Sequence, residues 1–220
     1  MRTMNDAAPF SLAGSSLGDT RHICAFFGSD EEEYRVLLPF IRDGFAAGDR
    51  AIHVVNNEGR EDHLQRLARV GLDTASLEAS GQLEVRSSAE TYLRDGRFDQ
   101  DRMLEVFKGL SDSTSGHGYP RNRIVCRMDW AAAGRSFVDN VIEFESRVND
   151  LWSQRRDVVI CSYHLRQFSG DAVIDIMRTH PMVIIGGFLQ RNPFFVPPPQ
   201  FLPDFRNRRA DESASHSPRV

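Results

Sequence analysis

The stretch "HICAFFGSDEEEYRVLLPFIRDGFAAGDRAIHVV", residues 22–55, decides the fold. An apolar run at 22–27 predicts a strand, and a second run at 51–56 predicts another. Between them, one apolar stripe recurs at helical spacing and predicts a helix over residues 31–47; it consists of Tyr34, Leu37, Leu38, Ile41 and Phe45. Strand, tight turn, helix and strand in this order are the layout of a phosphate-binding βαβ unit.

The turn of this unit lacks the residues that bind phosphate. A phosphate loop needs several glycines, a lysine and a Ser or Thr, whereas this turn offers Gly28 and Ser29 followed by four acids at 30–33. Ser29 and Glu32 fit a capping box, so carboxylates satisfy the free amides of the helix N-terminus themselves. Two like charges about 4 Å apart cost on the order of 4 kcal/mol at an effective dielectric constant near 20. The sequence therefore predicts that this turn does not bind a nucleotide triphosphate in the usual way.

Strand and helix signals alternate along the rest of the chain. Further strands are predicted at 83–87, 123–128, 157–163 and 182–187, and further helices at 59–70, 100–115, 136–153 and 170–179. The later strands are continuous apolar runs, which are typical of a parallel sheet covered on both faces. We therefore predict an α/β three-layer sandwich with a mainly parallel sheet and helices on both faces.

Composition restricts the kind of protein. The chain has 220 residues and a net charge of −4 with acids and bases interspersed, which predicts no nucleic-acid or membrane partner. The sequence shows no membrane-spanning run and no secretory signal, so we expect a cytoplasmic protein. Its three cysteines lie in apolar runs without metal-site spacing, as buried thiols in a reducing compartment do. We expect a flexible leader at 1–20, one domain at 21–202 and a disordered tail at 203–220.

Three blocks of sequence resemble the MEDS family, the methanogen/methylotroph DcmR-like sensory domain. They are "HICAFFGSDEEE", then "PFIRDGFAAGDRAIHVV" with its Phe–x3–Gly–x3–Gly–acid pattern, and "VVICSYHLRQF" together with "HPMVIIGGFLQRNPFFVPPPQFL". The resemblance implies a fold like the RecA/KaiC ATPases, in which KaiC-type sequences have a similar Phe–Gly–Gly–acid stretch, with a degenerate phosphate loop. It also implies sensing of small hydrocarbon derivatives and signalling through a histidine kinase or transcription regulator. One departure is His164, which stands where the family usually has an aspartate.

Ligand-binding candidates come from the rule that ligands lie beyond the carboxyl ends of parallel strands. They are Phe27, Asp129, Trp130, Tyr163 and His164. The three aromatic residues suit an apolar pocket or, equally, ordinary core. Asp129 suits a magnesium ligand or, alternatively, a cap of the following segment.

A metal site is a weaker hypothesis. His22, Cys161 and His164 are ligands that would suit zinc or iron if they met. Cys161 and His164 are three residues apart on one strand, however, so their side chains tend to opposite faces. His22 opens its strand at the end opposite the expected crevice, where a structural role is the alternative.

The sequence favours a non-enzymatic sensor of a small organic molecule, since no catalytic motif such as GxSxG or HExxH occurs. One alternative is a nucleotide-binding protein or ATPase with a noncanonical phosphate site that uses Asp129. Another is a regulator whose pocket is vestigial. The identity of the ligand, any cofactor and the existence of a homo-oligomer stay open.

Overall fold

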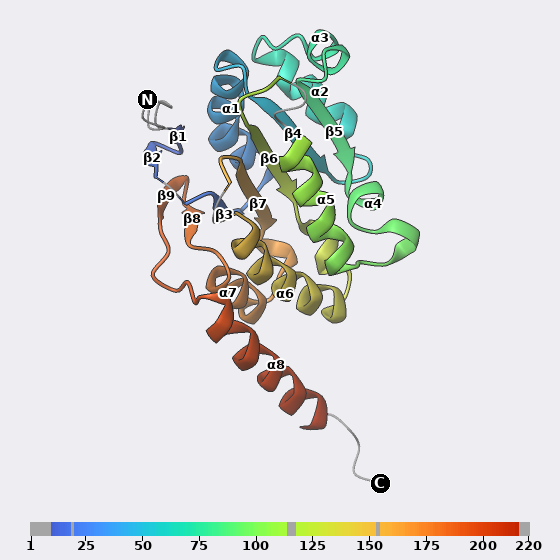
Figure 1. Cartoon of the computed structure of the whole chain (residues 1–220), viewed down its shortest axis with the longest axis vertical. Coiled ribbons are helices and arrows are strands. Elements are labelled where there is room, and N and C mark those ends of the chain that lie inside the picture. The colour runs from blue at the N-terminus through green and yellow to red at the C-terminus, as the bar shows by residue number, and fades with distance from the viewer. Residues whose placement is uncertain (1–9, 19, 114–117, 153–154, 216–220) are drawn as a thin grey trace.

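The structure is a computed structural model that describes residues 10–18, 20–113, 118–152 and 155–215 (Figure 1). In these residues seven strands form one sheet in the order β5-β4-β6-β7-β3-β8-β9. The strands are β3 (His22–Phe27), β4 (Arg50–Val55), β5 (Leu83–Ser87), β6 (Asn122–Arg127), β7 (Val158–His164), β8 (Met182–Ile185) and β9 (Phe188–Arg191). All neighbours pair in parallel except β8 and β9. The prediction of a mainly parallel sheet is confirmed.

Helices cover both faces of this sheet (Figure 1). One face packs on α1 (Asp30–Ala46), α2 (Arg60–Arg69) and the short α3 (Thr74–Ala79). The other packs on α5 (Gln100–Ser113), α6 (Arg135–Trp152), α7 (Gly170–Arg178) and α8 (Pro198–Ser215), with the single-turn α4 (Ser88–Thr91) at the edge. Alternate residues of β3 divide between the two cores: Ile23 and Phe27 face α1, whereas Cys24 and Phe26 face α6.

The Phe–x3–Gly–x3–Gly–acid pattern has a structural explanation, because its residues hold the side chain of Arg123 on β6. The guanidinium lies 4.5 Å from the centre of the Phe40 ring and donates to the Phe40 carbonyl at 2.6 Å. Its Nε donates to Asp49 Oδ2 at 2.7 Å. A Cβ on Gly44 would lie 2.7 Å from Arg123 Cδ, and Gly48 ends the helix with φ +77°. The motif therefore fastens α1 and the start of β4 to the centre of the sheet.

Both ends of the chain differ from the sequence expectation. Within the expected flexible leader, β1 (Phe10–Leu12) and β2 (Ser15–Leu17) form an antiparallel hairpin that buries Leu12 and Leu17. Within the expected disordered tail, residues 203–215 continue α8, and Phe205 is buried on the core beside Phe201. In both segments, burial of a few apolar side chains, Leu12 and Leu17 in the first and Phe205 in the second, stabilises structure despite the polar composition. Residues 1–9, 19 and 216–220 lie outside the described part.

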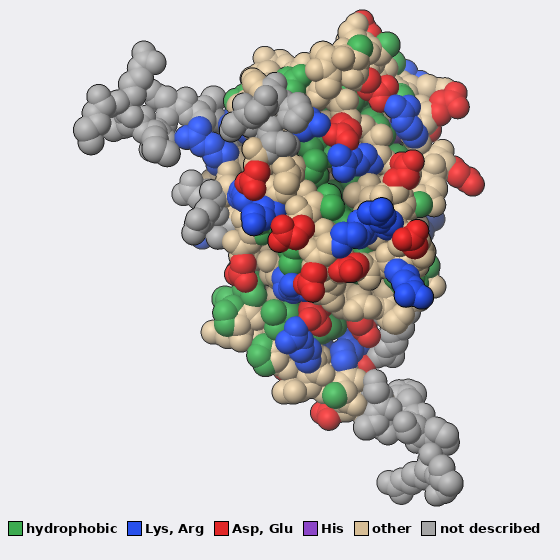
Figure 2. Space-filling model, turned by 45° about the vertical axis from the view of Figure 1, so that its right-hand side comes forward, with side chains coloured by type: hydrophobic (Ala, Val, Ile, Leu, Met, Phe, Trp, Pro, Cys, Tyr) green, Lys and Arg blue, Asp and Glu red, His purple; other side chains and the backbone are tan. Residues whose placement is uncertain are grey.

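No helix in the described ranges is long and apolar enough to cross a bilayer. On the face shown in Figure 2, acidic and basic side chains are interspersed. All three cysteines are free and buried, and burial raises the pKa of the Cys126 thiol to about 12 and that of the Cys24 thiol well above its ordinary value. Cys24 and Cys126 are therefore placed as small apolar core residues.

Candidate functional site

The turn between β3 and α1 is filled by its own carboxylates. The Gly28 amide donates to Glu32 Oε2 at 2.7 Å, and the Glu32 amide donates to Ser29 Oγ at 3.3 Å. Only half of the capping box expected from the sequence forms, because the Glu32 carboxylate accepts from the amide of Gly28 and not from that of Ser29. These contacts still use amides that a phosphate loop would offer to its nucleotide. An incoming phosphate would have to displace a carboxylate from this position.

The same turn closes a network of charged side chains, the strand-end network, formed by Asp30, Glu33, Arg127, Asp129 and His164. Arg127 Nη2 donates to Asp30 Oδ1 at 2.9 Å and forms a short ion pair with Glu33. Both oxygens of Asp129 accept from His164, one from its amide at 3.0 Å and one from Nδ1 at 2.6 Å. The opposite nitrogen, Nε2, lies 3.1 Å from Asp30 Oδ1. Arg127 and, when it is protonated, His164 therefore offset two of the three carboxylate charges of this site.

Sheet order explains why these residues meet. β7 lies between β3 and β6, so the carboxyl ends of the three strands are adjacent. Ser162, two residues before His164 on the same face of β7, donates to Glu33 Oε1 at 2.7 Å and ties the network to α1. The hydrogen bond to Asp129, more than any other contact, raises the pKa of His164 above its ordinary value, while burial opposes the increase.

The strand-end network could also hold a cation. Ligand atoms of Asp30, Glu33 and His164 lie within 4.8 Å of one another. The guanidinium of Arg127 already pairs with both acids, and a metal ion would have to compete with it. Both Asp129 oxygens are engaged by His164, so a magnesium ion would have to displace this histidine. These hydrogen bonds reach the end of β7 and do not cap the segment after Asp129, which was the alternative expectation.

The five ligand-binding candidates do not line one pocket. Asp129 and His164 pair with each other on the α1 side of the sheet. Phe27 is completely buried in the core on that side, and Tyr163 is completely buried on the opposite side, where its hydroxyl donates to Glu145 Oε1 at 2.8 Å. Trp130, 9% exposed, stacks on Tyr92 with ring centres 4.8 Å apart. The three aromatic side chains thus point into the two cores rather than into a crevice.

A hollow of about 270 Å³ lies beside these residues, beyond the carboxyl ends of β6 and β7. We call it the α6–α7 hollow; its lining includes Val138, Asp139, Gln167, Phe168, Ser169 and Arg209. The hollow adjoins one of the predicted ligand-binding residues: the ring of Phe168, in its lining, meets the Tyr163 ring edge-on with centres 5.4 Å apart. Sequence reasoning missed this lining. Phe168 follows β7 by four residues and could have been found by extending the strand-end rule; Arg209 comes from the segment expected to be disordered.

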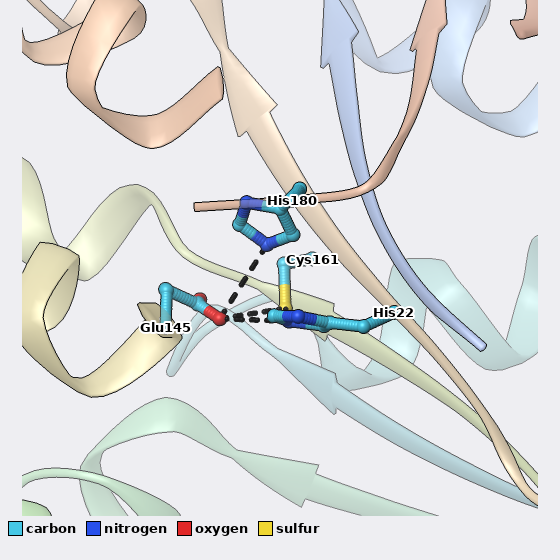
Figure 3. A group of neighbouring side chains, drawn as sticks. All are labelled: His22, Glu145, Cys161 and His180. Atoms are coloured by element: carbon cyan, nitrogen blue, oxygen red, sulfur yellow. Dashed lines mark hydrogen bonds and ion pairs between the residues drawn. The ribbon is translucent and has the colours of Figure 1, made fainter. Parts of the chain in front are cut away.

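Two of the candidate metal ligands, Cys161 and His164, lie on opposite faces of the sheet, as their spacing along one strand predicts. Cys161 faces α6 and lies near His22, whereas His164 faces α1 in the strand-end network. The two residues found beside His22 and Cys161 are Glu145 and His180 (Figure 3). Glu145 had a sequence signal, because it falls on the apolar stripe of α6 between Val141 and Val148.

The fold and the filled turn together define an α/β domain of the RecA/KaiC type without a working phosphate loop. In agreement, the structure is similar to that of a KaiC-like protein from the archaeon Pyrococcus horikoshii OT3, with a TM-score of 0.53 and 14% identity over 74% of this chain and 69% of that one. Residues 21–181 match the model of the MEthanogen/methylotroph, DcmR Sensory domain (MEDS), and the chain belongs to this family. The resemblance seen in the three sequence blocks is confirmed.

A relative of known function indicates the kind of protein in which such a domain occurs. The transcriptional repressor DcmR of Methylorubrum extorquens (strain DSM 6343 / CIP 106787 / DM4) is 26% identical over 183 residues, which are 81% of this chain. The match spans 64% of the length of that repressor. A sensory and regulatory role is thus supported at the level of the family.

Proposed function

We propose that this domain binds a small, weakly polar organic molecule in the α6–α7 hollow and thereby regulates a transcription regulator or histidine kinase. The observation that carries the proposal is the filled turn: Glu32 occupies the Gly28 amide, and Arg127 and His164 engage the neighbouring acids. With the phosphate position closed, we place the ligand in the α6–α7 hollow, about 270 Å³, which lies beyond the carboxyl ends of β6 and β7. Phe168 and Val138 offer apolar contacts to such a ligand, and the polar and charged side chains of the lining, among them Gln167, Ser169 and Arg209, offer hydrogen bonds to a polar group on it.

The proposed role is non-enzymatic. The similarity to the KaiC-like protein supports the fold alone. Asp129, the acid that a Walker-type magnesium site would use, accepts hydrogen bonds from His164 with both oxygens. Regulation of transcription is supported by the repressor among the relatives of this chain.

A thermal-shift screen tests the ligand class. The panel contains short alcohols, ketones and halogenated alkanes, with ATP–Mg as the competing hypothesis. We expect stabilisation by at least one organic compound and none by micromolar ATP–Mg. Phe168→Ala should abolish the stabilisation, while Phe188→Ala, whose ring is exposed on β9, should retain it.

The opposite pattern would reject the proposal: stabilisation by ATP–Mg with no response to any organic compound. Phosphate release that is lost in Asp129→Asn would likewise establish the ATPase alternative. Stabilisation by an organic compound that persists unchanged in Phe168→Ala would place the ligand elsewhere.

A further inference from the structure

We propose that His22, Glu145, Cys161 and His180 form a binding site for one divalent transition-metal ion, zinc or ferrous iron, inside the domain. The four residues come from separate elements: β3, α6, β7 and the segment between α7 and β8 (Figure 3). All are buried, none more than 3% exposed. The site lies on the α6 side of the sheet, away from the strand-end network.

The distances between the ligand atoms suit a tetrahedral ion. Glu145 Oε2 lies 3.0 Å from His22 Nε2, 3.5 Å from His180 Nε2 and 3.5 Å from Cys161 Sγ. Cys161 Sγ lies 3.8 Å from His22 Nε2. Zinc at about 2.0–2.1 Å from nitrogen or oxygen and about 2.3 Å from sulfur would place tetrahedral ligands roughly 3.3–3.7 Å apart. These four separations lie within a few tenths of an ångström of that range, and all four ligand atoms lie within 4.8 Å of one another.

The outer hydrogen bonds fix which nitrogen of each histidine is free to bind. Asn149 donates its amide hydrogens to backbone carbonyls, including that of Thr179 at 2.7 Å, so its Oδ1 is the acceptor for His22 Nδ1 at 3.1 Å. His180 Nδ1 lies 2.8 Å from the carbonyl of Ile176, which can only accept. Both rings therefore carry hydrogen on Nδ1 and direct the lone pair of Nε2 inward. Such partners are the usual outer shell of metal-bound histidines.

Without a cation, this arrangement is unfavourable. Two lone pairs and a carboxylate oxygen converge, and His180 Nε2 is buried without a hydrogen-bond partner among the described residues. A proton on one ring would let it donate to Glu145, and the Cys161 thiol can donate to the same oxygen at 3.5 Å, but the Nε2 lone pair of the other ring would still face that carboxylate. A metal ion engages all four ligand atoms, and Tyr163 orients the carboxylate by donating to Glu145 Oε1 at 2.8 Å.

The donor set indicates the class of metal. One thiolate and two imidazoles favour zinc or ferrous iron, whereas calcium and magnesium prefer oxygen ligands. The ion would join β3, α6, β7 and the segment between α7 and β8, and its outermost ligands, His22 and His180, are 158 residues apart along the chain. Its role would therefore be to hold the core together, independently of the organic ligand proposed above.

The test measures metal bound to the whole chain after purification without a metal-affinity step. We expect one zinc or iron per chain by elemental analysis. We also expect cobalt reconstitution to give a thiolate-to-cobalt charge-transfer band. Cys161→Ser should remove the band and weaken metal affinity by more than roughly tenfold. Cys126→Ser is the matched control, a buried cysteine of the same core outside the cluster, and should keep both.

A variant with serine at both other cysteines, Cys24→Ser with Cys126→Ser, covers the case in which Cys161→Ser fails to fold. Retention of the charge-transfer band in this double variant identifies Cys161 as the sulfur ligand. Loss of the band in the folded double variant would overturn the proposal. So would a wild-type chain that binds no zinc, iron or cobalt at micromolar concentration, or equal binding by wild type and His180→Gln.

Discussion

Acid should destabilise this domain through a pair of neutral histidines buried between α1, α2 and β4. The Tyr34 hydroxyl lies 2.7 Å from His63 Nδ1, and His53 Nδ1 lies 2.8 Å from His63 Nε2. Burial, and after it the charge of Arg127, lowers the pKa of His63 to about 4. Burial, and after it the neighbouring His63, also lowers the pKa of His53 well below its ordinary value.

The sign and size of the effect follow from the difference between the folded and unfolded pKa. Below pH 6.5 the unfolded chain protonates His63, while the folded chain does not until about pH 4. The stability contributed by His63 is therefore complete above pH 6.5 and is lost as the pH falls toward 4. At about 1.4 kcal/mol per pH unit, the loss is about 3 kcal/mol in the free energy of unfolding.

Urea unfolding at pH 7 and pH 4.5 measures this loss. Between these two values, wild type should lose about 2.5 kcal/mol more than His63→Gln, which keeps polar contacts but cannot titrate. Tyr34→Phe is the control, because it removes the hydroxyl and leaves both imidazoles, and it should lose as much as wild type. Equal losses in wild type and His63→Gln, or a measured His63 pKa near 6.5, would refute the reasoning.

Two further predictions concern the packing motif and the strand-end network. Gly44→Ala should lower the melting temperature, with a cost of about 1–3 kcal/mol, because its methyl group would meet Arg123. Gly109→Ala, in a helix with open space around it, should instead raise stability by about 0.5–1 kcal/mol; equal effects of the two variants would contradict this explanation. His164→Gln should change the pH dependence in the opposite direction to His63. Since the folded pKa of His164 is raised, its contribution is complete below pH 6.5 and is lost as the pH rises through the folded value. The urea midpoint of wild type should therefore exceed that of the variant by more at pH 6 than at pH 9, and an unchanged gap would count against the bond to Asp129 as its cause.

Much of the fold could be predicted because apolar periodicity is a local signal. The helix expected at 31–47 runs from Asp30 to Ala46, and the strand expected at 22–27 has those bounds. The last helix could not be predicted in the same way. Residues 203–215 are polar and contain Pro203, and their helix depends on Phe205 and on ion pairs such as that of Arg206 with Glu143. Such tertiary contacts are not visible in a local pattern.

The candidate site shows a similar division. The strand-end rule names Asp129 and His164, and the structure brings them together because β6 and β7 are neighbours. The rule does not say on which face a side chain lies, so it could not separate Tyr163, which points into the core, from His164 beside it. Glu145 and His180 were missed because the strand-end rule names residues that follow strands, whereas Glu145 lies within α6 and His180 follows α7.

The contacts of Phe40, Gly44 and Asp49 with Arg123 affect how relatives of this domain can be recognised. These residues hold one arginine at the start of β6, at the end of the sheet opposite the carboxyl ends where ligands of parallel sheets bind. A search that relies on the glycine spacing of this segment will therefore collect proteins with a shared scaffold, whether or not they hydrolyse ATP. The turn after the first central strand is the place to inspect when ATPases are to be told apart from sensors of this kind.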